Sequence, residues 1–393
     1  MKTDLRMEQV REKSENLMPE LKLLSQSIYD EPELGNEEFK SAQKHISLLK
    51  KYGFQVTQPY LEVETGFKAI YKSQKEGPTI AYLCEYDALP GIGHGCGHNI
   101  LGTTSTGAGI VLKSLIDEIG GTVIVFGTPA EETSGAKVKY ADEGAFEDVD
   151  IALVAHPNSQ YNRSGKSLAM EAIQFDYHGK TSHAAAAPEK GINALDAVIN
   201  TFNNINALRQ QTASDARIHG VIKAGGEAAN IIPEHTMAQF YVRAQTKTYL
   251  NELVKKVKAC AEGASMAAGT SLEISNYEYS YDNLVTNETL SQLFVDQLDT
   301  LGVVGVSDAR DSFGSLDAGN VSHKCPTIHP YFDIVGDPSV AAHTRKFAES
   351  TLTDYAYENM QIVICALVLT AVKVIENKAI LDQIKAEFDA QVK

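Results

Sequence analysis

The sequence lacks a long apolar run and an excess of basic residues. The longest apolar stretch, Ile362 to Val372, is about half of the roughly 18–20 residues that a membrane span needs, and it predicts a buried helix instead. Across 393 residues, 35 Lys and Arg face 51 Asp and Glu, which gives a net charge of −16. This charge disfavours non-specific binding to nucleic acid or to anionic membranes. We therefore expect neither nucleic acid nor a membrane among its partners.

The sequence also lacks a disulfide framework. Its cysteines are odd in number and widely spaced: Cys84, Cys96, Cys260, Cys325 and Cys365. The first six residues contain no apolar signal core. Both features predict a cytoplasmic protein whose cysteines are free to bind metal or to act as thiols.

Length and strand pattern indicate a layered catalytic domain. A chain of this length predicts two domains. Three short runs are almost entirely apolar, as expected for strands buried on both faces of a parallel sheet: Thr79 to Cys84, Thr122 to Phe126 and Ile151 to Val154. Asn99 to Ile119, between the first two, has the pattern of a helix. The alternation predicts an α/β domain with a mostly parallel central sheet flanked by helices.

The pattern changes near Met170. Between 170 and 284, strand-like and helix-like segments follow the order β-α-β-β-α-β, which is typical of a split-βαβ, α+β domain. After Asn283 the chain becomes helical again and ends in a long apolar helix, Asp354 to Glu376. We therefore expect a discontinuous catalytic domain, 1–169 and 285–393, interrupted by an inserted lid and dimerisation domain, 170–284.

Acidic residues and a histidine follow the three predicted strands. The first strand runs into Asp87, the second into Glu131 and Glu132, and the third into His156. Because ligands bind outside the carboxyl ends of strands in open α/β sheets, parallel strands would place these side chains on one rim.

The loop from Gly91 to Asn99 contains Cys96 and His98 among alternating glycines. Thiolate and imidazole are good zinc ligands, and glycines let the backbone approach a bound group closely. The alternative is a glycine turn in which the cysteine and histidine are incidental. The loop is not a dinucleotide-binding G-x-G-x-x-G motif, and the sequence has no Walker A lysine.

Glu131 and Glu132 are adjacent, and adjacent carboxylates often lie in a solvated turn. Neighbouring side chains of an extended segment point in opposite directions. Beside a metal, one glutamate could therefore bind the ion while the other glutamate takes a proton from metal-bound water. His156 or His343 alone would more often be a core histidine. The Cys-x-His loop, the glutamate pair at a strand end and His156 at another strand end together favour a metal site, although Cys96 as a thiol nucleophile remains an alternative. G-x-S-x-G and H-E-x-x-H motifs are absent.

A set of motifs, in order along nearly the whole chain, resembles the M20 metallopeptidase/amidohydrolase family. The resemblance is strongest to its cysteine-containing branch, subfamily D, and to the dipeptidase-like and aminobenzoyl-glutamate hydrolase members there. The motifs are Glu85 to Gly91, Gly93 to Asn99, Thr128 to Glu132, His156, Gly179 to Ala185 and Gly225 to Pro233. The family has an α/β catalytic domain that binds one or two divalent ions and an inserted lid that usually dimerises.

The resemblance implies a ligand set for two ions. Cys96 would bridge both of them. Glu132 and His343 would complete the shell of one ion, and His98 and His156 would complete the shell of the other. Zinc is the expected metal because of the thiolate, with manganese and cobalt as alternatives.

The resemblance also implies other roles. Glu131 would be the general base and acid, and Asp87 would orient a metal ligand. On the lid, His183 would stabilise the oxyanion, and Asn230 and Arg243 would hold the substrate carboxylate. The alternatives are that His183 caps the following helix and that Arg243 is a surface strand residue.

Two departures from the family pattern affect the expected substrate. Asn99 replaces an aspartate found in many amidohydrolases of the branch, which favours a dipeptide-like or aryl-amide substrate. Gly314 and Ser315 match a substrate-binding Gly-Ser-Thr-Asp stretch, but Leu316 replaces its threonine. Any polar contact made by that threonine is therefore lost.

The expected function is metal-dependent hydrolysis of an amide bond in a small dipeptide-like, N-acyl or aminobenzoyl amino acid with a free carboxylate. The expected partners are this small substrate and a second copy of the chain, bound through the lid in a homodimer or a larger homo-oligomer. One alternative is an inactive, metal-containing binding or scaffold protein of the same fold. A nucleotide-binding α/β enzyme is a weaker alternative because the sequence lacks a phosphate loop.

Overall fold

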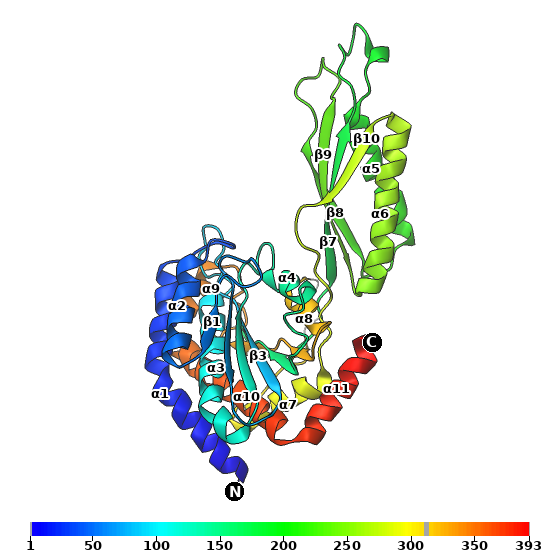
Figure 1. The fold of residues 1–393 in the computed structure, drawn as a ribbon. Helices are drawn as coiled ribbons and strands as arrows, with labels where there is room; N and C mark the ends of the chain where they lie inside the picture. Colours follow the sequence, from blue (N-terminus) through cyan, green and yellow to red (C-terminus); the bar gives the residue numbers. More distant parts are fainter. Residues whose placement is uncertain (1, 310–313, 393) are drawn as a thin grey trace. The chain divides into compact units, whose positions relative to one another are not determined.

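The computed structural model describes residues 2–309 and 314–392, with side chains from Leu5 onward. Its contacts divide the chain into two compact units (Figure 1). The second unit comprises Ser167–Asn283 together with Gly314 and Ser315, and the first comprises the rest. Gly314 and Ser315, expected in the catalytic domain, join the second unit because the N–H of Leu168 donates to the carbonyl of Gly314 at 2.9 Å and Arg243 donates to the hydroxyl of Ser315 at 3.3 Å.

The first unit contains a six-stranded sheet in the order β1-β2-β4-β3-β5-β11. Strands β3, β4, β5 and β11 are parallel, whereas β2 runs antiparallel to β4, and β1 antiparallel to β2. The strands are β1 Gln55–Thr57, β2 Phe67–Lys72, β3 Thr79–Cys84, β4 Thr122–Gly127, β5 Ile151–Leu153 and β11 Thr327–Ile328. The predicted mostly parallel sheet is thus present, with an antiparallel edge that the sequence pattern did not indicate.

The central strands are apolar because both faces of the sheet are covered. In β3, Tyr82 packs on one face among residues of α1, α3 and α10, while Leu83 packs on the other among residues of α4 and α8. Both side chains are fully buried. The covering helices are α1 Lys2–Asp30, α3 His98–Ile119, α10 Asp354–Glu376, α4 Ala136–Asp142 and α8 Ala318–Ser322.

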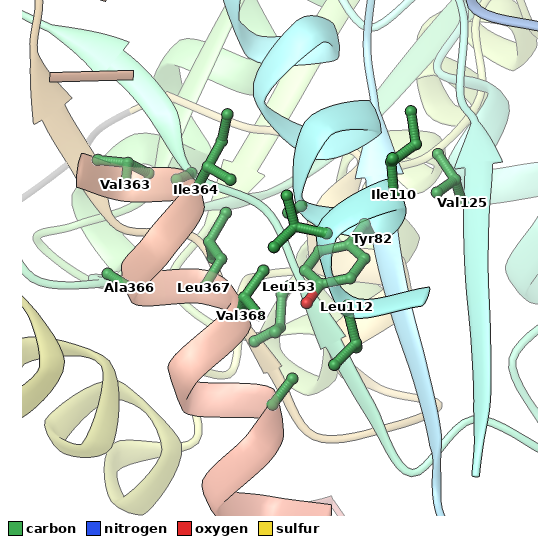
Figure 2. Close-up of a cluster of buried hydrophobic side chains, with 14 of the residues drawn as sticks. Tyr82, Ile110, Leu112, Val125, Leu153, Val363, Ile364, Ala366, Leu367 and Val368 are labelled. Atoms are coloured by element: carbon green, nitrogen blue, oxygen red, sulfur yellow. The ribbon is translucent and has the colours of Figure 1, made fainter. Parts of the chain in front are cut away.

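Helix α10 is apolar on nearly all sides because it lies inside the first unit. Its length and its mean hydropathy of 1.7 over 18 residues are those of a membrane-spanning helix, but 72% of that window is buried within the protein. Figure 2 shows Leu367 and Val368 of α10 packed with Tyr82 and Leu153 of the sheet. A helix that is hydrophobic all round is typical of such a central position.

Shorter elements complete the first unit. Helix α2 spans Phe39–Lys51 and packs beside α1, and a small parallel pair joins β6, His156–Asn158, to β12, Tyr331–Asp333. The remaining helices are α7 Glu288–Thr300, α9 Arg345–Ser350 and α11 Lys378–Val392.

The second unit is an antiparallel sheet with two helices on one face. The strand order is β10-β7-β9-β8, and the chain order β7-α5-β8-β9-α6-β10 is the predicted split-βαβ pattern. Inward residues such as Phe175 and Phe240 form its core with the two helices. The elements are β7 Ala169–His178, α5 Ala194–Leu208, β8 Arg217–Ala224, β9 His235–Ala244, α6 Lys247–Ala268 and β10 Ser271–Asn276, with short 3₁₀ turns at Pro188–Lys190 and Arg209–Gln211.

Candidate metal centre

Polar side chains follow the carboxyl ends of three parallel strands in the sheet of the first unit. Strand β3 is followed by Asp87, β4 by Glu131 and Glu132, and β5 by His156. Because β3 pairs in parallel with both β4 and β5, their carboxyl ends meet at the same edge. This is the edge where open α/β sheets bind ligands.

His98 is oriented by Asp87. Its Nδ1 lies 2.9 Å from Oδ1 of Asp87, and both side chains are fully buried. The other oxygen of Asp87 accepts the backbone N–H of Glu132 at 2.9 Å. Nε2 of His98, on the other side of the ring, has no hydrogen-bond partner among the described residues. A carboxylate behind an imidazole in this way is the usual arrangement at a metal-binding histidine.

His156 offers its Nε2 in the same manner. Its Nδ1 lies 2.7 Å from the carbonyl of Pro157, to which it can donate, and its Nε2 lies 3.5 Å from Sγ of Cys96. Burial lowers the pKa of His156 to about 3, so the ring is neutral near pH 7. A neutral imidazole is the form that binds a cation.

The loop between β3 and α3 turns Cys96 and His98 toward one another through a glycine. Gly97 has φ of 81°, and a Cβ at this position would lie 2.6 Å from Cγ of Pro157. Only glycine therefore fits between the two candidate ligands without displacing Pro157. Burial raises the pKa of the Cys96 thiol, so a nearby cation is needed to hold it as a thiolate.

Glu132 and His343 form the third side of the cluster. Nε2 of His343 lies 3.4 Å from Oε1 of Glu132. Burial acts to raise the pKa of Glu132, but the bond with His343 and the charge of His98 outweigh it and lower the pKa to about 2. His343 has φ of 64° and Ala130, which precedes the glutamate pair, has φ of 61°. Left-handed backbone at non-glycine residues is concentrated at functional sites.

Glu131 lies beside these ligands in a different electrostatic environment. Burial, and then the charges of Glu85 and Asp317, raise the pKa of Glu131 well above its ordinary value. The two adjacent glutamates thus differ in the protonation state that they favour, as expected if one binds a cation and the other exchanges a proton.

The ligand atoms converge in three groups, each with all members within 4.8 Å of one another. Cys96 belongs to two of the groups. The groups are Cys96, His98 and His156; Cys96, Glu132 and His343; and His98, Glu131 and Glu132. The first two are the ligand sets that the resemblance implied, and their sulfur, nitrogen and oxygen donors suit zinc-like divalent ions. The donor types and the free Nε2 of His98 fit a pair of such ions.

Sequence reasoning missed two residues beside the cluster. His329 follows the short strand β11, and its ring lies 5.5 Å from the ring of His156. Lys137 is fully buried in α4 and forms ion pairs with Glu85 and Asp317. His329 follows a strand end, as His156 does. This signal was missed because a strand of two residues cannot be recognised in the sequence.

The lid residues singled out from the sequence lie in the second unit and form two local pairs. Nδ1 of His183 accepts the N–H groups of Ala185 and Ala186, at 3.3 and 3.2 Å, and the N–H of Ala184 donates to the carbonyl of Asn230 at 3.0 Å. His183 thus caps a turn and not the following helix α5, whose N-cap is Asn193, and this bond leaves its Nε2 available.

The second pair joins Arg243 to Ser315. The guanidinium of Arg243 donates to the hydroxyl of Ser315 at 3.3 Å and lies 5.6 Å from the ring centroid of Tyr241. A guanidinium stacked on an aromatic ring and bonded to a hydroxyl is held in place, which suits it to bind a carboxylate.

Comparison with known proteins identifies relatives along almost the whole chain. Residues 167–266 match the peptidase dimerisation domain family. The Xaa-Arg dipeptidase of Mus musculus is 35% identical over 387 residues, covering 94% of this chain and 89% of that protein. A p-aminobenzoyl-glutamate hydrolase polypeptide of Escherichia coli is 32% identical over 302 residues, covering 71% of this chain and 62% of that protein.

Solved structures share the fold at lower identity. An aminobenzoyl-glutamate utilization protein from Klebsiella pneumoniae is 18% identical with a TM-score of 0.70, covering 94% of this chain and 98% of that one. A dinuclear metal-binding peptidase of the M20 family from Bacillus subtilis is 19% identical with a TM-score of 0.68, covering 92% and 99%. Together with the dipeptidase match, these findings show that the chain belongs to the M20 family of peptidases and amidohydrolases.

Proposed function

We propose that this protein is a metal-dependent hydrolase that cleaves an amide bond in a small dipeptide-like, N-acyl or aminobenzoyl amino acid with a free carboxylate. One observation carries the proposal: Cys96 belongs to two potential ligand groups, and the half-buried Glu131 lies within 4.8 Å of His98 and Glu132 of these groups. The relatives are named as an Xaa-Arg dipeptidase, an aminobenzoyl-glutamate hydrolase and an N-acetyl-L-cysteine deacetylase, and all three names describe such substrates.

We propose that the five candidate ligands would divide between two zinc ions. Cys96 would be shared, Glu132 and His343 would hold one ion, and His98 and His156 would hold the other. When bound, such ions polarise an amide carbonyl and lower the pKa of a water molecule. The thiolate favours zinc over the harder magnesium and calcium ions.

Glu131 would carry the proton during the reaction. Its carboxyl group would take a proton from the attacking water and then donate it to the nitrogen of the leaving amine. Its pKa is raised well above the ordinary value, first by burial and then by the charges of Glu85 and Asp317, so this carboxyl group holds a transferred proton more tightly than an ordinary glutamate does. Glu132 cannot take this role, because its pKa of about 2 keeps it ionised.

The second unit supplies the groups that we assign to the rest of the substrate. Arg243, held by Ser315 and Tyr241, would bind the substrate carboxylate with the help of Asn230. His183 would donate from Nε2 to the oxyanion of the tetrahedral intermediate, since its Nδ1 accepts backbone N–H groups.

We also propose a cytoplasmic homodimer formed through the second unit. The match to a peptidase dimerisation domain supports pairing of this unit with a second copy. Strand β8 lies at the edge of its sheet, and Val221 on it is 54% exposed. An exposed apolar edge strand is a ready site for pairing with another chain. The five cysteines are free thiols, as expected in a reducing compartment.

Replacing Glu131 with Gln tests the catalytic assignment. The variant is expected to retain bound zinc at the wild-type ratio but to lose at least about a hundredfold in kcat, the usual contribution of a general base. Turnover of dipeptides, N-acyl amino acids and aminobenzoyl-glutamate would be measured with zinc, manganese or cobalt present. The matched control is Glu76→Gln, a change in the exposed loop before β3, at the opposite end of the strand from the cluster.

Two outcomes would contradict this proposal. Full activity of the Glu131 variant would exclude its role as the base. If the metal-loaded wild-type protein hydrolyses none of these amides, the inactive binding or scaffold protein becomes the better interpretation.

A further inference from the structure

A buried lysine lies directly behind the metal cluster. The Nζ atom of Lys137 is 2.7 Å from Oδ1 of Asp317 and 2.8 Å from Oε1 of Glu85, and none of the three side chains is more than 1% exposed. The backbone N–H of Lys137 also donates to the other oxygen of Asp317 at 3.2 Å. Lys137 is therefore fixed at both its backbone and its ammonium group.

The second oxygen of Glu85 faces a metal ligand. Oε2 of Glu85 lies 3.4 Å from Nε2 of His98, the nitrogen that Asp87 leaves free to bind an ion. Zinc lies about 2.0–2.2 Å from nitrogen and carboxylate oxygen ligands, so an ion bound at Nε2 of His98 would lie near this carboxylate. Glu85 is therefore close enough to become a ligand after a small rotation of its carboxylate.

A further carboxylate ligand would interfere with the proposed reaction. Catalytic zinc sites keep a coordination position open for water or substrate, whereas structural sites are closed. The five predicted ligands would already supply one sulfur, three imidazole nitrogens and one carboxylate to two ions. Binding of Glu85 would occupy a coordination position that a catalytic site keeps open for water or substrate.

We propose that Lys137 is a positioning residue that withholds Glu85 from the metal centre. Its ammonium group binds Oε1 of Glu85, and Asp317 holds Lys137 in place, so that Glu85 cannot rotate onto the ion at His98. This inference rests on the proposed metal-dependent function. A buried ion pair by itself adds little to the stability of the folded state. Stability alone therefore does not explain the burial of Lys137, whereas a positioning role does.

The sign of a change in metal affinity separates this role from a purely structural one. In the variant Lys137→Met, which keeps an unbranched side chain, one atom shorter, but removes its charge, Glu85 would be free to bind the ion. Zinc affinity should therefore rise, by about tenfold, while kcat falls and KM changes little. A lysine that only maintained the local fold would instead lower zinc affinity when removed.

The experiment titrates zinc into metal-free full-length protein in competition with a chromophoric chelator, and follows the visible absorption of the cobalt-loaded form. A rise in zinc affinity with weaker cobalt d–d absorption, which indicates a higher coordination number, would support the proposal. An unchanged or lower affinity would overturn it. The affinity comparison does not depend on turnover, so a protein that binds zinc but hydrolyses no amide would refute only the proposed function.

Two further variants make the test specific to Glu85. In Lys137→Met/Glu85→Gln the neutral amide is a poor ligand, so zinc affinity should return to the wild-type value. Equal affinity in this variant and in Lys137→Met would overturn the proposal. If Lys137→Met alone does not fold, Lys137→Met/Asp317→Asn leaves only one uncompensated carboxylate and should still show the tighter binding.

A matched control removes a second partly buried cation far from the cluster. Arg6 of α1 forms ion pairs with Glu118 at 2.7 Å and Glu376 at 3.0 Å, and its side chain is 11% exposed. Arg6→Met should lower stability without changing zinc affinity. A similar rise in affinity in this variant would count against a specific role for Lys137.

Discussion

The backbone N–H of Ala130 donates to Oε1 of Glu38 at 2.8 Å, and this bond fixes the turn that leads into Glu131 and Glu132. Ala130 has a left-handed backbone with φ of 61°, which is unfavourable for a residue with a side chain. The other oxygen of Glu38 accepts the hydroxyl of Thr65 at 2.9 Å. A carboxyl group far away in the sequence thus stabilises the strained residue just before Glu131.

Glu38 should make the protein less stable as pH rises. Burial, and then the charge of Asp87, raise the pKa of Glu38 to about 7. Because the folded state binds the proton more tightly than the unfolded state, the stabilising contribution is complete below about pH 4.5 and is lost as pH rises through about 7. In Glu38→Gln the decrease of the free energy of unfolding between about pH 4.5 and 7 should be smaller by on the order of 2 kcal/mol. Urea unfolding across this pH range measures it.

The neighbouring variant Glu37→Gln is the matched control, because Glu37 is exposed. It should keep the wild-type dependence of unfolding free energy on pH. If Glu38→Gln shows the same decline as the wild type, the raised pKa is not the cause.

Asp87 should control zinc affinity through His98. Asp87→Asn replaces the carboxylate that lies 2.9 Å from Nδ1 of His98 with a neutral amide. The amide should orient the imidazole ring less firmly and increase its basicity less than the carboxylate does. Loss of such a partner typically costs 10–100-fold in metal affinity, and we expect about that loss here. Chelator competition measures it. Asp117→Asn, at a carboxylate that binds the exposed hydroxyl of Tyr71, should leave the affinity unchanged.

The parts of the fold that the sequence predicts are those with a local signal. The central strands are continuous apolar runs because both faces are buried, and the second unit has the strand and helix order expected from its alternation. The cluster was predictable because its ligands follow strand ends or the glycine loop at Cys96. His343 was placed there only by the resemblance, since its own surroundings in the sequence contain no strand.

The missed elements lack such a signal. Strand β2 has polar Lys68 and Lys72 among its six residues, because alternate side chains reach the solvent at the antiparallel edge. Strand β11 has two residues, so in the sequence His329 is not distinguishable from a loop residue. Lys137 in a helix resembles any surface lysine, and its burial depends on Asp317, 180 positions away.

A charge on the edge strand of the second unit should weaken the proposed homodimer. Strand β8 pairs with β9 on one side only, and Val221 on it is exposed. Val221→Lys introduces a charge that opposes pairing of two such edges, so the monomer fraction should rise at a fixed protein concentration. Light scattering after size-exclusion chromatography measures the mass. Met266→Lys, on the outside of α6 and 85% exposed, is the control, and an equal shift there would contradict an interface at β8.

Removing the metal should separate the roles of the two adjacent glutamates by stability alone. A ligand that binds only the folded state stabilises it by about 4 kcal/mol at a free concentration of about 1,000 times its Kd, so a chelator should lower the Tm of the wild type by several degrees. Glu132→Gln removes a predicted ligand beside His343, and its Tm should respond less than that of the wild type to zinc or chelator, because one of the two predicted ion sites is lost. Glu131→Gln should keep the full response, because this carboxyl group is assigned to the proton and not to the ion. If the two variants responded alike, the division of labour between Glu131 and Glu132 would be wrong, whatever their activities.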